Sequence, residues 1–366
     1  MRVLVTTDLP GDDWRRLLAA AGCHPDVRPS PAVPDEDRLV ALIGDRCDAA
    51  IGQLTEPWTA RVLEALRAAG GRALATYAVG FNNIDLAAAT RLGIPVGTTP
   101  GVLTEATAEL AVALTLAAAR HLVPADRYTR DGRFTAWRPD LFLGALLHQR
   151  TLGLVGPGRI GTAYARALVA GHHMHLVYHG RSRKPELEAE IAALSRHFTR
   201  HRQPPVSCRF APDLDDLLAA ADVVALHTPL TPETRHLVDA RRLALMKPDA
   251  ILVNTSRGPV VDEAALVTHL QAHPAFRAAL DVYEHEPELA AGLAALPNTV
   301  LLPHLGSATH WSRQSMAAIA ARNVAACLQQ LPAWTGDDIL PFLSATPPAA
   351  APSIVNAAQL GLPTLP

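Results

Sequence analysis

The chain has 366 residues, which is long enough for two domains. Of these residues, 49% are hydrophobic and 19% charged, a composition typical of soluble globular proteins. Its formal net charge of −2 gives no electrostatic reason to expect nucleic acid or a membrane surface as a partner. The four cysteines lack Cys-x-x-Cys spacing and the histidines lack partners at metal-ligand spacing. We therefore expect neither disulfides nor a metal site, and a cytoplasmic location.

Residues 2–99 alternate short apolar runs with helical patterns. The expected elements are strands at 2–6, 48–51 and 73–76, and helices at 12–21, 36–43 (capped by Asp35) and 55–69. The first strand begins directly after Met1, so we expect no signal peptide. This alternation predicts a parallel sheet covered by helices.

A long helix is expected at 104–121, after Pro100-Gly101, and the stretch 124–150 is expected to be irregular. The apolar run 110–119 is too short to span a bilayer. Because 104–150 is the longest apolar stretch that neither sheet needs, we expect it to join two copies of the chain in a homodimer.

The strand expected at 151–155 runs directly into Gly156-Pro157-Gly158-Arg159-Ile160-Gly161, and a helical segment at 162–170 follows. This Gly-x-Gly-x-x-Gly pattern suits a dinucleotide pyrophosphate. The first glycine allows a tight turn, the second lets backbone approach the phosphates, and the third lets helix pack on strand. The helix N-terminus offers free N–H groups to the anion.

The next strand, at 175–178, ends at His179-Gly180-Arg181-Ser182-Arg183-Lys184. In this region a carboxylate would normally hold the ribose 2′-hydroxyl of NAD, but here there are three cations and a hydroxyl. Such a group suits a 2′-phosphate, which predicts a preference for NADP(H), with NAD(H) as a second cofactor. The alternative is a solvated basic loop.

Further strands are expected at 223–226, 250–254 and 277–281, and a last helix at 312–331. Two segments look appended to this pattern. Residues 187–212 are basic and contain a Pro-Pro pair, and residues 332–366 are rich in proline and alanine. We interpret them as a mobile loop and a disordered tail; docking of the tail along a partner subunit is the alternative.

Three ionisable residues follow the later strands: Arg257, Glu286 and His304. Ligands of an open parallel sheet bind outside the carboxyl ends of its strands, so the three can converge on a cofactor. A guanidinium can hold the carboxylate and carbonyl oxygens of a 2-keto acid, and an imidazolium can protonate the carbonyl. A carboxylate against the other ring nitrogen would fix the tautomer.

Together these motifs resemble the D-isomer-specific 2-hydroxyacid dehydrogenase family. The matching stretches, in the family's order, are 77–85, 105–111, 156–161, 222–230, 254–262, 281–287 and 303–309. Within the family, Ala78-Val-Gly-Phe-Asn-Asn-Ile-Asp85 and Gly180-Arg-Ser-Arg183 are most similar to glyoxylate and hydroxypyruvate reductases, also known as D-glycerate dehydrogenases.

The resemblance implies an enzyme that reduces glyoxylate or hydroxypyruvate. It implies Arg257 as substrate anchor, Glu286 as the partner of the histidine, and His304 as acid/base. The backbone at Val79 and Gly80 would receive the substrate carboxylate, and Leu54 and Trp137, the latter from a partner subunit, would limit the size of the substrate. Implied cofactor-facing residues, beyond the glycine and cation loops (156–161 and 180–183), are Thr107, His227, Thr228, Pro229, Thr234, Thr255, Ser256, Asp281, His304 and Gly306.

The fold class that follows is α/β, with two Rossmann-like, doubly wound parallel-sheet domains. A nucleotide-binding domain at 100–303, with the dimerisation arm at about 104–150, is inserted in a flavodoxin-like substrate domain at 1–99 and 304–331, and 332–366 is the tail. Pro157 departs from the Leu or Met usual in the family, and we expect it to be tolerated. Alternative functions are phosphite or other D-2-hydroxyacid dehydrogenation, although Val79 replaces the lysine of phosphite dehydrogenases, and a nucleotide-sensing co-repressor scaffold.

Overall fold

The computed structural model describes residues 1–29 and 32–366. The chain divides into two compact units: residues 1–103 with 307–366, and residues 104–306. Residues 2–99 and the last long helix thus lie in the same unit. The observed boundaries differ by a few residues from the expected 99/100 and 303/304.

The first unit is built on a parallel five-stranded sheet of order β2-β1-β3-β4-β5. Its strands are β1 (Arg2–Val5), β2 (His24–Val27), β3 (Ala49–Gly52), β4 (Leu74–Thr76) and β5 (Val96–Gly97). Its helices are α1 (Asp13–Ala20), α2 (Glu36–Ile43), α3 (Ala60–Ala68), α4 (Leu86–Arg91) and α12 (His310–Leu328). Helix α1 packs on α12, which lies against β3, β4 and β5, whereas α2, α3 and α4 share a separate core with Leu4 and Ala50.

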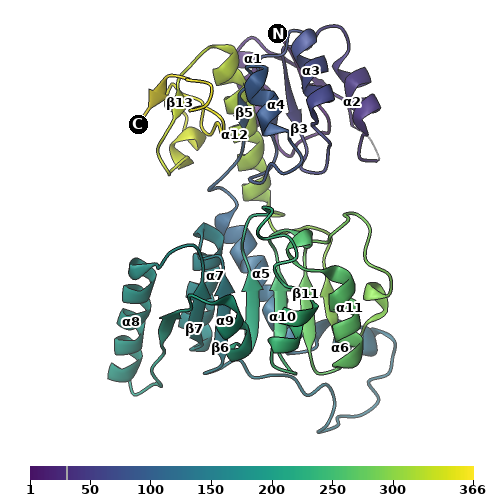
Figure 1. Ribbon diagram of the computed structural model, residues 1–366, viewed down its shortest axis with the longest axis vertical. Coiled ribbons are helices and arrows are strands. Elements are labelled where there is room, and N and C mark those ends of the chain that lie inside the picture. The colour runs from purple at the N-terminus through teal and green to yellow at the C-terminus, as the bar shows by residue number, and fades with distance from the viewer. Residues whose placement is uncertain (30–31) are drawn as a thin grey trace. The chain divides into compact units, whose positions relative to one another are not determined.

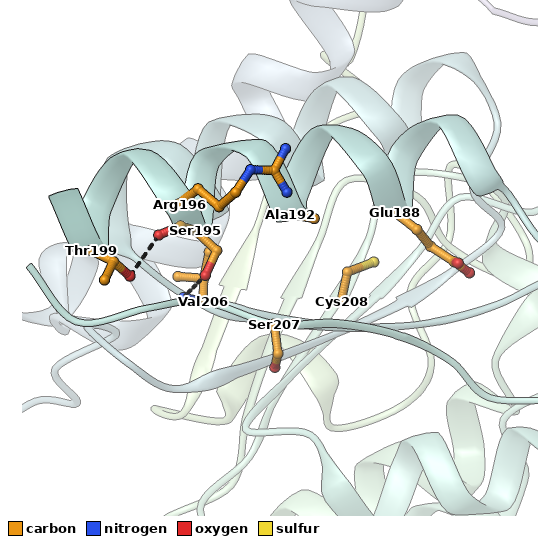
Figure 2. Close-up of a pocket in the computed structure, with 8 residues that line it drawn as sticks. All are labelled: Glu188, Ala192, Ser195, Arg196, Thr199, Val206, Ser207 and Cys208. Carbon is orange, nitrogen blue, oxygen red and sulfur yellow. Dashed lines mark hydrogen bonds between the residues drawn. The ribbon is translucent and has the colours of Figure 1, made fainter.

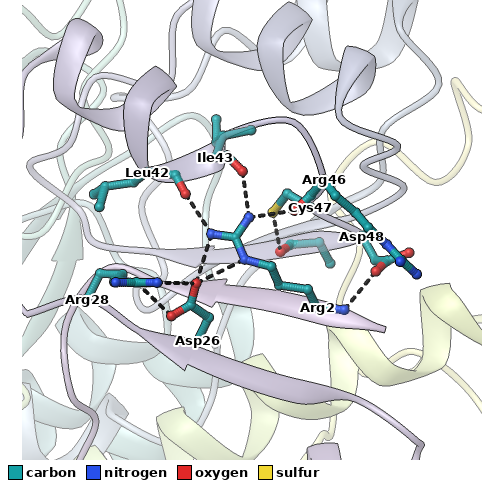
Figure 3. A network of polar contacts seen from close by, with 9 residues as sticks. Arg2, Asp26, Arg28, Leu42, Ile43, Arg46, Cys47 and Asp48 are labelled. Carbon is teal, nitrogen blue, oxygen red and sulfur yellow. Dashed lines mark hydrogen bonds and ion pairs between the residues drawn. The ribbon is translucent and has the colours of Figure 1, made fainter.

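The Arg2 side chain links three elements of this unit (Figure 3). Its Nε donates to Asp26 of β2 over 2.9 Å, and its Nη1 and Nη2 donate to the Ile43 and Leu42 carbonyls at the end of α2 over 2.5 and 2.7 Å. A guanidinium suits a helix C-terminus, where carbonyls lack partners. Arg2 therefore holds β1, β2 and α2 together.

The second unit contains a parallel seven-stranded sheet of order β12-β11-β10-β9-β6-β7-β8. Its strands are β6 (Thr151–Val155), β7 (His175–His179), β8 (Cys208–Phe210), β9 (Val223–Leu226), β10 (Ile251–Asn254), β11 (Arg277–Leu280) and β12 (Thr299–Leu301). Its helices are α5 (Thr104–Ala119), α6 (Leu122–Arg130), α7 (Arg159–His172), α8 (Pro185–Arg200), α9 (Leu214–Ala220), α10 (Ala240–Leu245) and α11 (Glu263–Ala272), with short 3-10 turns at Gly258–Val260 and Leu293–Ala295.

Both faces of the seven-stranded sheet are buried. Val223 and Ala225 of β9 belong to the core under α5, α7 and α8, whereas Val224 and Leu226 belong to the core with α9, α10 and α11. Parallel strands covered on both faces read as continuous apolar runs. This explains why the pattern at 223–226 predicts the strand correctly.

Two expectations about the appended segments are wrong. Residues 187–212 are not a mobile loop: most of them form α8 and β8, and α8 packs on β8, the edge strand beside β7 (Figure 1). Residues 332–366 are not disordered, since they form β13 (Ala333–Trp334), a 3-10 turn (Leu340–Leu343) and β14 (Thr364–Leu365) beside α12 (Figure 1). Asn356 buries its amide against β5, where Oδ1 accepts from Val96 N over 2.9 Å.

Three smaller corrections concern helices. The helix expected from residue 55 begins at Ala60, because the buried Glu56 side chain folds back to accept from the backbone N–H of Gln53. The irregular stretch expected at 124–150 begins inside α6, which extends to Arg130. Helix α5 is largely buried against α7, β10 and β11, so this part of 104–150 is needed by the sheet after all.

Among the described helices, none by itself is long and apolar enough to cross a membrane; α5 and α6 taken together, bent by 65°, meet that test on length and composition alone.

Candidate active site

The turn between β6 and α7 uses each glycine differently. Gly156 has a φ of +93°, a conformation that suits glycine. A Cβ on Gly161 would overlap with the Gly156 carbonyl oxygen, so the third glycine lets α7 approach the strand. Apart from Gly158 itself and its two chain neighbours, no described atom lies within 4 Å of the position that a Cβ would take on Gly158. The turn therefore leaves open space at its second glycine, where Arg159 and Ile160 begin α7.

Two hydroxyls follow the neighbouring strands. Thr228 follows β9 and Thr255 follows β10, and within the described part of the chain their Oγ1 atoms are buried without a hydrogen-bond partner. Buried polar atoms without partners are rare in folded proteins. Together with the glycine turn, these atoms fit a polar ligand such as a dinucleotide at the carboxyl ends of the strands.

Three further predicted residues near the ends of β9 and β10 contact other groups of the protein. The His227 ring lies 5.1 Å from the Tyr164 ring, and burial lowers the pKa of His227 to about 4, so this histidine is neutral at pH 7. The hydroxyl of Thr234 donates to the Pro229 carbonyl over 2.7 Å, and that of Ser256 donates to Asn254 over 2.8 Å. In this structure, Thr234 and Ser256 therefore shape the loops through their own side chains.

The loops after β11 and β12 bring His304 and Glu286 into contact. His304 Nδ1 lies 2.8 Å from Glu286 Oε2, and the other carboxylate oxygen accepts from the backbone N–H of Tyr283 over 3.0 Å. His304 has a φ of +56° and its backbone N–H donates to the Asp281 carbonyl over 2.9 Å. With Nδ1 facing Glu286, Nε2 is the ring nitrogen available for proton transfer.

The Asp281 carboxylate organises the backbone that follows His304. It accepts from the N–H groups of Leu305 over 2.6 Å and Gly306 over 2.8 Å. Burial raises the pKa of Asp281 above its ordinary value, although these two N–H groups favour the charged form. A Cβ on Gly306 would lie 3.3 Å from both the Asp281 carboxylate and Thr107, so these three predicted residues come together.

Arg257 lies in the loop after β10, and its Nη1 donates to the Ser256 carbonyl over 2.7 Å. Burial lowers the pKa of this guanidinium, and the charge of Glu286 acts in the opposite direction. Directly after it, a Cβ on Gly258 would overlap with the Tyr283 carbonyl group. The loop with Arg257 thus packs on the loop with Glu286, so all three predicted catalytic residues follow strands of one sheet.

The predicted cation loop is only partly free. Arg183 is paired with Glu188 through an Nη2–Oε2 distance of 2.6 Å, whereas Arg181 and Ser182 are exposed. A Cβ on Gly180 would lie 2.7 Å from Pro157 Cδ, so this glycine makes room for the unusual proline. Sequence reasoning missed Glu188, although a carboxylate five residues after Arg183 in a helical pattern was visible.

Three predicted substrate residues lie in the first unit. Leu54 follows β3, and Val79 and Gly80 follow β4, which pairs with β3 in parallel, so both loops lie at one edge of that sheet. Asn83 ties them together: its Nδ2 donates to the Gln53 carbonyl over 3.0 Å and to the Glu56 carbonyl over 2.8 Å. Sequence reasoning singled out neither Asn83 nor the buried Glu56, because their roles depend on contacts between the two loops.

Trp137 stands apart from these groups. Its side chain is 78% exposed in the irregular stretch after α6, which also exposes Phe134, Leu143 and Leu146. Trp137 is therefore not part of the core of its own chain. Among the described residues there is no cluster of His, Cys, Asp or Glu that could hold a metal ion.

Comparisons with known proteins agree with this geometry. Residues 112–306 match the model of the D-isomer specific 2-hydroxyacid dehydrogenase, NAD binding domain. The chain is 46% identical to the peroxisomal glycerate dehydrogenase of Arabidopsis thaliana (99% of this chain, 95% of the relative) and 45% identical to the glyoxylate reductase of Thermococcus onnurineus (80% of each).

A solved structure is similar as well. The NADPH-dependent glyoxylate/hydroxypyruvate reductase of Sinorhizobium meliloti, in complex with NADP and malonate, superposes with a TM-score of 0.74 at 28% identity, over 96% of this chain and 98% of that one. The fold, the glycine turn, the His304–Glu286 pair and the near full-length identity therefore lead to one conclusion: the chain belongs to the D-isomer specific 2-hydroxyacid dehydrogenase family.

Proposed function

We propose that the protein reduces glyoxylate and hydroxypyruvate to glycolate and D-glycerate, with NADPH as cofactor and His304 as general acid. The observation that carries the proposal is the contact between His304 Nδ1 and Glu286, in the same sheet-end cluster as Arg257 and the glycine turn. The names of the relatives, a glycerate dehydrogenase and glyoxylate reductases, support the substrate class.

A bound nicotinamide would supply the hydride to the 2-keto carbon. Arg257 would bind a carboxylate oxygen and the carbonyl oxygen through its planar fork, which orients the keto group. His304 would donate the proton on Nε2 to the carbonyl oxygen as that oxygen becomes an alcohol. Glu286, held by the Tyr283 N–H, would keep the imidazole in place and fix its tautomer.

The first unit would serve as the substrate domain and the second as the nucleotide-binding domain. In the substrate domain, the backbone at Val79 and Gly80 would receive the substrate carboxylate, and Leu54 would limit the substrate to small acids. Val79 offers no cation for a phosphite dianion, which favours a keto acid.

The preference for NADPH rests on the loop after β7. Arg181 and Ser182 are exposed, and no carboxylate follows β7 directly to repel a 2′-phosphate. The relative from Sinorhizobium meliloti, which is named NADPH-dependent and was solved with NADP, supports this choice.

A panel assay tests the proposed reaction. We expect oxidation of NADPH with glyoxylate and with hydroxypyruvate, and a higher kcat/KM with NADPH than with NADH. A higher kcat/KM with NADH would overturn the cofactor preference. Reduction of NADP⁺ with phosphite would favour the phosphite alternative, and tight NADPH binding without turnover of any acid would favour the sensing scaffold.

The role of His304 needs its own variant. His304→Ala should lower kcat by about 10²- to 10⁴-fold, because general acid catalysis is lost, and should leave NADPH binding nearly intact. The exposed His310→Ala is the matched control and should keep full activity. Arg257→Ala should impair both KM and kcat. Equal turnover of His304→Ala and the unmodified enzyme would remove His304 from the mechanism.

We also propose a homodimer joined through the exposed stretch 131–150 rather than through α5. Exposed apolar side chains gathered in one stretch are typical of an interface, and Trp137 would reach the partner's substrate pocket. Sedimentation tests the dimer, and a monomer would exclude it. Trp137→Ala should change the kcat/KM ratio between glyoxylate and phenylpyruvate; an unchanged ratio would exclude that role.

A cytoplasmic location stays a prediction from the cysteine pattern, and the Arabidopsis relative is named as peroxisomal.

A further inference from the structure

The cations after β7 differ in what they contact. Arg183 forms a two-point pair with Glu188 of α8: Nη2 lies 2.6 Å from Oε2, and Nε lies 3.2 Å from Oε1. Two parallel bonds between a guanidinium and a carboxylate occupy one edge of the fork. Arg181, in contrast, has an exposed side chain that forms no hydrogen bond or ion pair with another described residue.

Glu188 is held in place by the end of β7. Its Oε1 accepts from the Tyr178 hydroxyl over 2.5 Å, and that hydroxyl accepts from the backbone N–H of Lys184 over 2.7 Å. The Glu188 side chain is 21% exposed, against 65% for Arg183. Figure 2 shows Glu188 on α8, at one end of a pocket of about 390 Å³ between α8 and β8.

The charge of this carboxylate persists near neutral pH. The hydrogen bonds from Arg183 and Tyr178 lower the pKa of Glu188 below its ordinary value. A 2′-phosphate that approached Arg183 would have to compete with a fixed anion for the same fork, and the two anions would repel each other. A 2′-hydroxyl is neutral and experiences no comparable repulsion.

We propose that Glu188 is a specificity-determining residue, which occupies Arg183 and so limits the selectivity for a 2′-phosphate, leaving Arg181 as the main cation for that group. This inference rests on the proposed binding of a dinucleotide at the loop 180–184. It predicts that the protein discriminates moderately between NADP(H) and NAD(H) and that one neutralising substitution strengthens the discrimination.

The test compares adenosine 2′,5′-bisphosphate with AMP, two ligands that differ only in the 2′-phosphate, by calorimetry on the full-length protein. Glu188→Gln keeps the size of the side chain and an oxygen that can accept from Tyr178, but removes the charge. We expect it to tighten the bisphosphate about 2- to 5-fold, the range typical of partly exposed ion pairs, and to leave AMP affinity unchanged.

Two controls make the result specific. Glu190→Gln removes the same charge two residues further along α8, where the carboxylate pairs with Arg166 at 2.8 Å, and should leave the affinity ratio unchanged. In an Arg183→Ala background, Glu188→Gln should give no gain, because its effect acts through Arg183.

The inference is overturned if Glu188→Gln leaves the ratio of bisphosphate affinity to AMP affinity unchanged or lowers it. It is also overturned if Glu190→Gln raises this ratio equally. The proposed cofactor preference is judged separately, by the unmodified protein. If that protein binds the bisphosphate no more tightly than AMP, the preference for NADP(H) fails, while the change caused by Glu188→Gln still decides the role of Glu188.

Discussion

At the scale of single residues, Gly258 lets the loop that carries Arg257 pack on the loop that carries Glu286. Its φ is not in the left-handed region, so its importance is steric rather than conformational. A Cβ at this position would overlap with the Tyr283 carbonyl, which belongs to backbone rather than to a flexible side chain. Backbone cannot move aside without displacing Glu286, whose carboxylate accepts from Tyr283 N.

Gly258→Ala should therefore impair activity through misplacement of Arg257 and Glu286. We expect kcat/KM to fall by more than tenfold and stability to fall by about 1–3 kcal/mol, as for other overpacked sites. Gly171→Ala is the control: Gly171 lies in α7 with open space around its Cβ position, so alanine should stabilise the helix by about 0.5–1 kcal/mol. Steady-state kinetics measure the activity of the two variants, and thermal melts measure their stability. Full activity of Gly258→Ala would show that the loops with Arg257 and Glu286 are not coupled.

Motifs marked the residues that carry reactive groups, but not the residues that place them. The interpretation of Arg257, Glu286 and His304 came from their types and from the family pattern. Asn83, Gly258 and Glu188 act on the loops through contacts with particular atoms. Asn83 and Gly258 lie inside the family stretches 77–85 and 254–262, and Glu188 follows Arg183 by five residues, but the sequence does not show which atoms these residues contact.

At the scale of elements, the β6–α7 turn and the end of β7 constrain each other. Pro157 Cδ would lie 2.7 Å from a Cβ on Gly180, a distance that real Cβ atoms essentially never show. The departure from the family pattern at Pro157 is thus matched by a glycine on the neighbouring strand end.

Gly180→Ala should weaken NADPH binding about tenfold, because the added methyl group pushes against the turn that would hold the pyrophosphate. The double variant Pro157→Ala/Gly180→Ala should recover most of the loss, since the clashing ring is gone. Fluorescence titration with NADPH provides both dissociation constants. A double variant as weak as Gly180→Ala would contradict this coupling.

The Arg2 network is a second link between elements (Figure 3). Burial alone would raise the pKa of Asp26, but hydrogen bonds from Arg28 and Arg2 bring it below its ordinary value. A carboxyl with a lowered folded-state pKa stabilises the fold above its unfolded pKa of about 3.9 and loses this contribution as the pH falls through the folded value.

Arg2→Ala should therefore lower the free energy of unfolding by about 2 kcal/mol at pH 7, and the difference from the unmodified protein should shrink below about pH 4. The carbonyls of Leu42 and Ile43 lose their donor at every pH, so part of the difference should persist. Urea denaturation between pH 3 and 7 measures the effect. Arg16→Ala, which breaks an exposed pair with Asp13 on α1, is the control and should change stability little at any pH. If the stability difference between Arg2→Ala and the unmodified protein grew as the pH fell, the expected pH dependence would be wrong.

At the scale of the whole molecule, the C-terminal segment completes the first unit. Asn356 is fully buried: Oδ1 accepts from Val96 N over 2.9 Å, and Nδ2 donates to the Ile94 carbonyl over 3.0 Å. Ser353 adds a bond from its N–H to Asn323 of α12 over 2.9 Å. The segment thus satisfies backbone and side-chain groups that would otherwise be buried without partners.

Asn356→Ala should lower the thermal stability markedly, by about 2–3 kcal/mol, because it leaves buried backbone groups of residues 94 and 96 unpaired. Gln359→Ala, on the exposed part of the same segment, is the control and should stay within about 0.5 kcal/mol of the unmodified protein. A melting temperature of Asn356→Ala equal to that of the control would show that the segment adds nothing to the unit.

The sequence alone determined the buried parallel strands, the glycine turn and the order of the proposed catalytic residues. Each is a local pattern: strands buried on both faces need continuous apolar runs, and a tight turn before a helix needs glycines at fixed spacing. The tertiary structure decided the rest. Most of residues 187–212 form α8 and β8, because β8 pairs with β7 and α8 packs against β8, and Asn356 contacts Val96 from 260 positions away. Such contacts depend on which surfaces the folded chain brings together, and the local sequence around each residue does not reveal its distant partner.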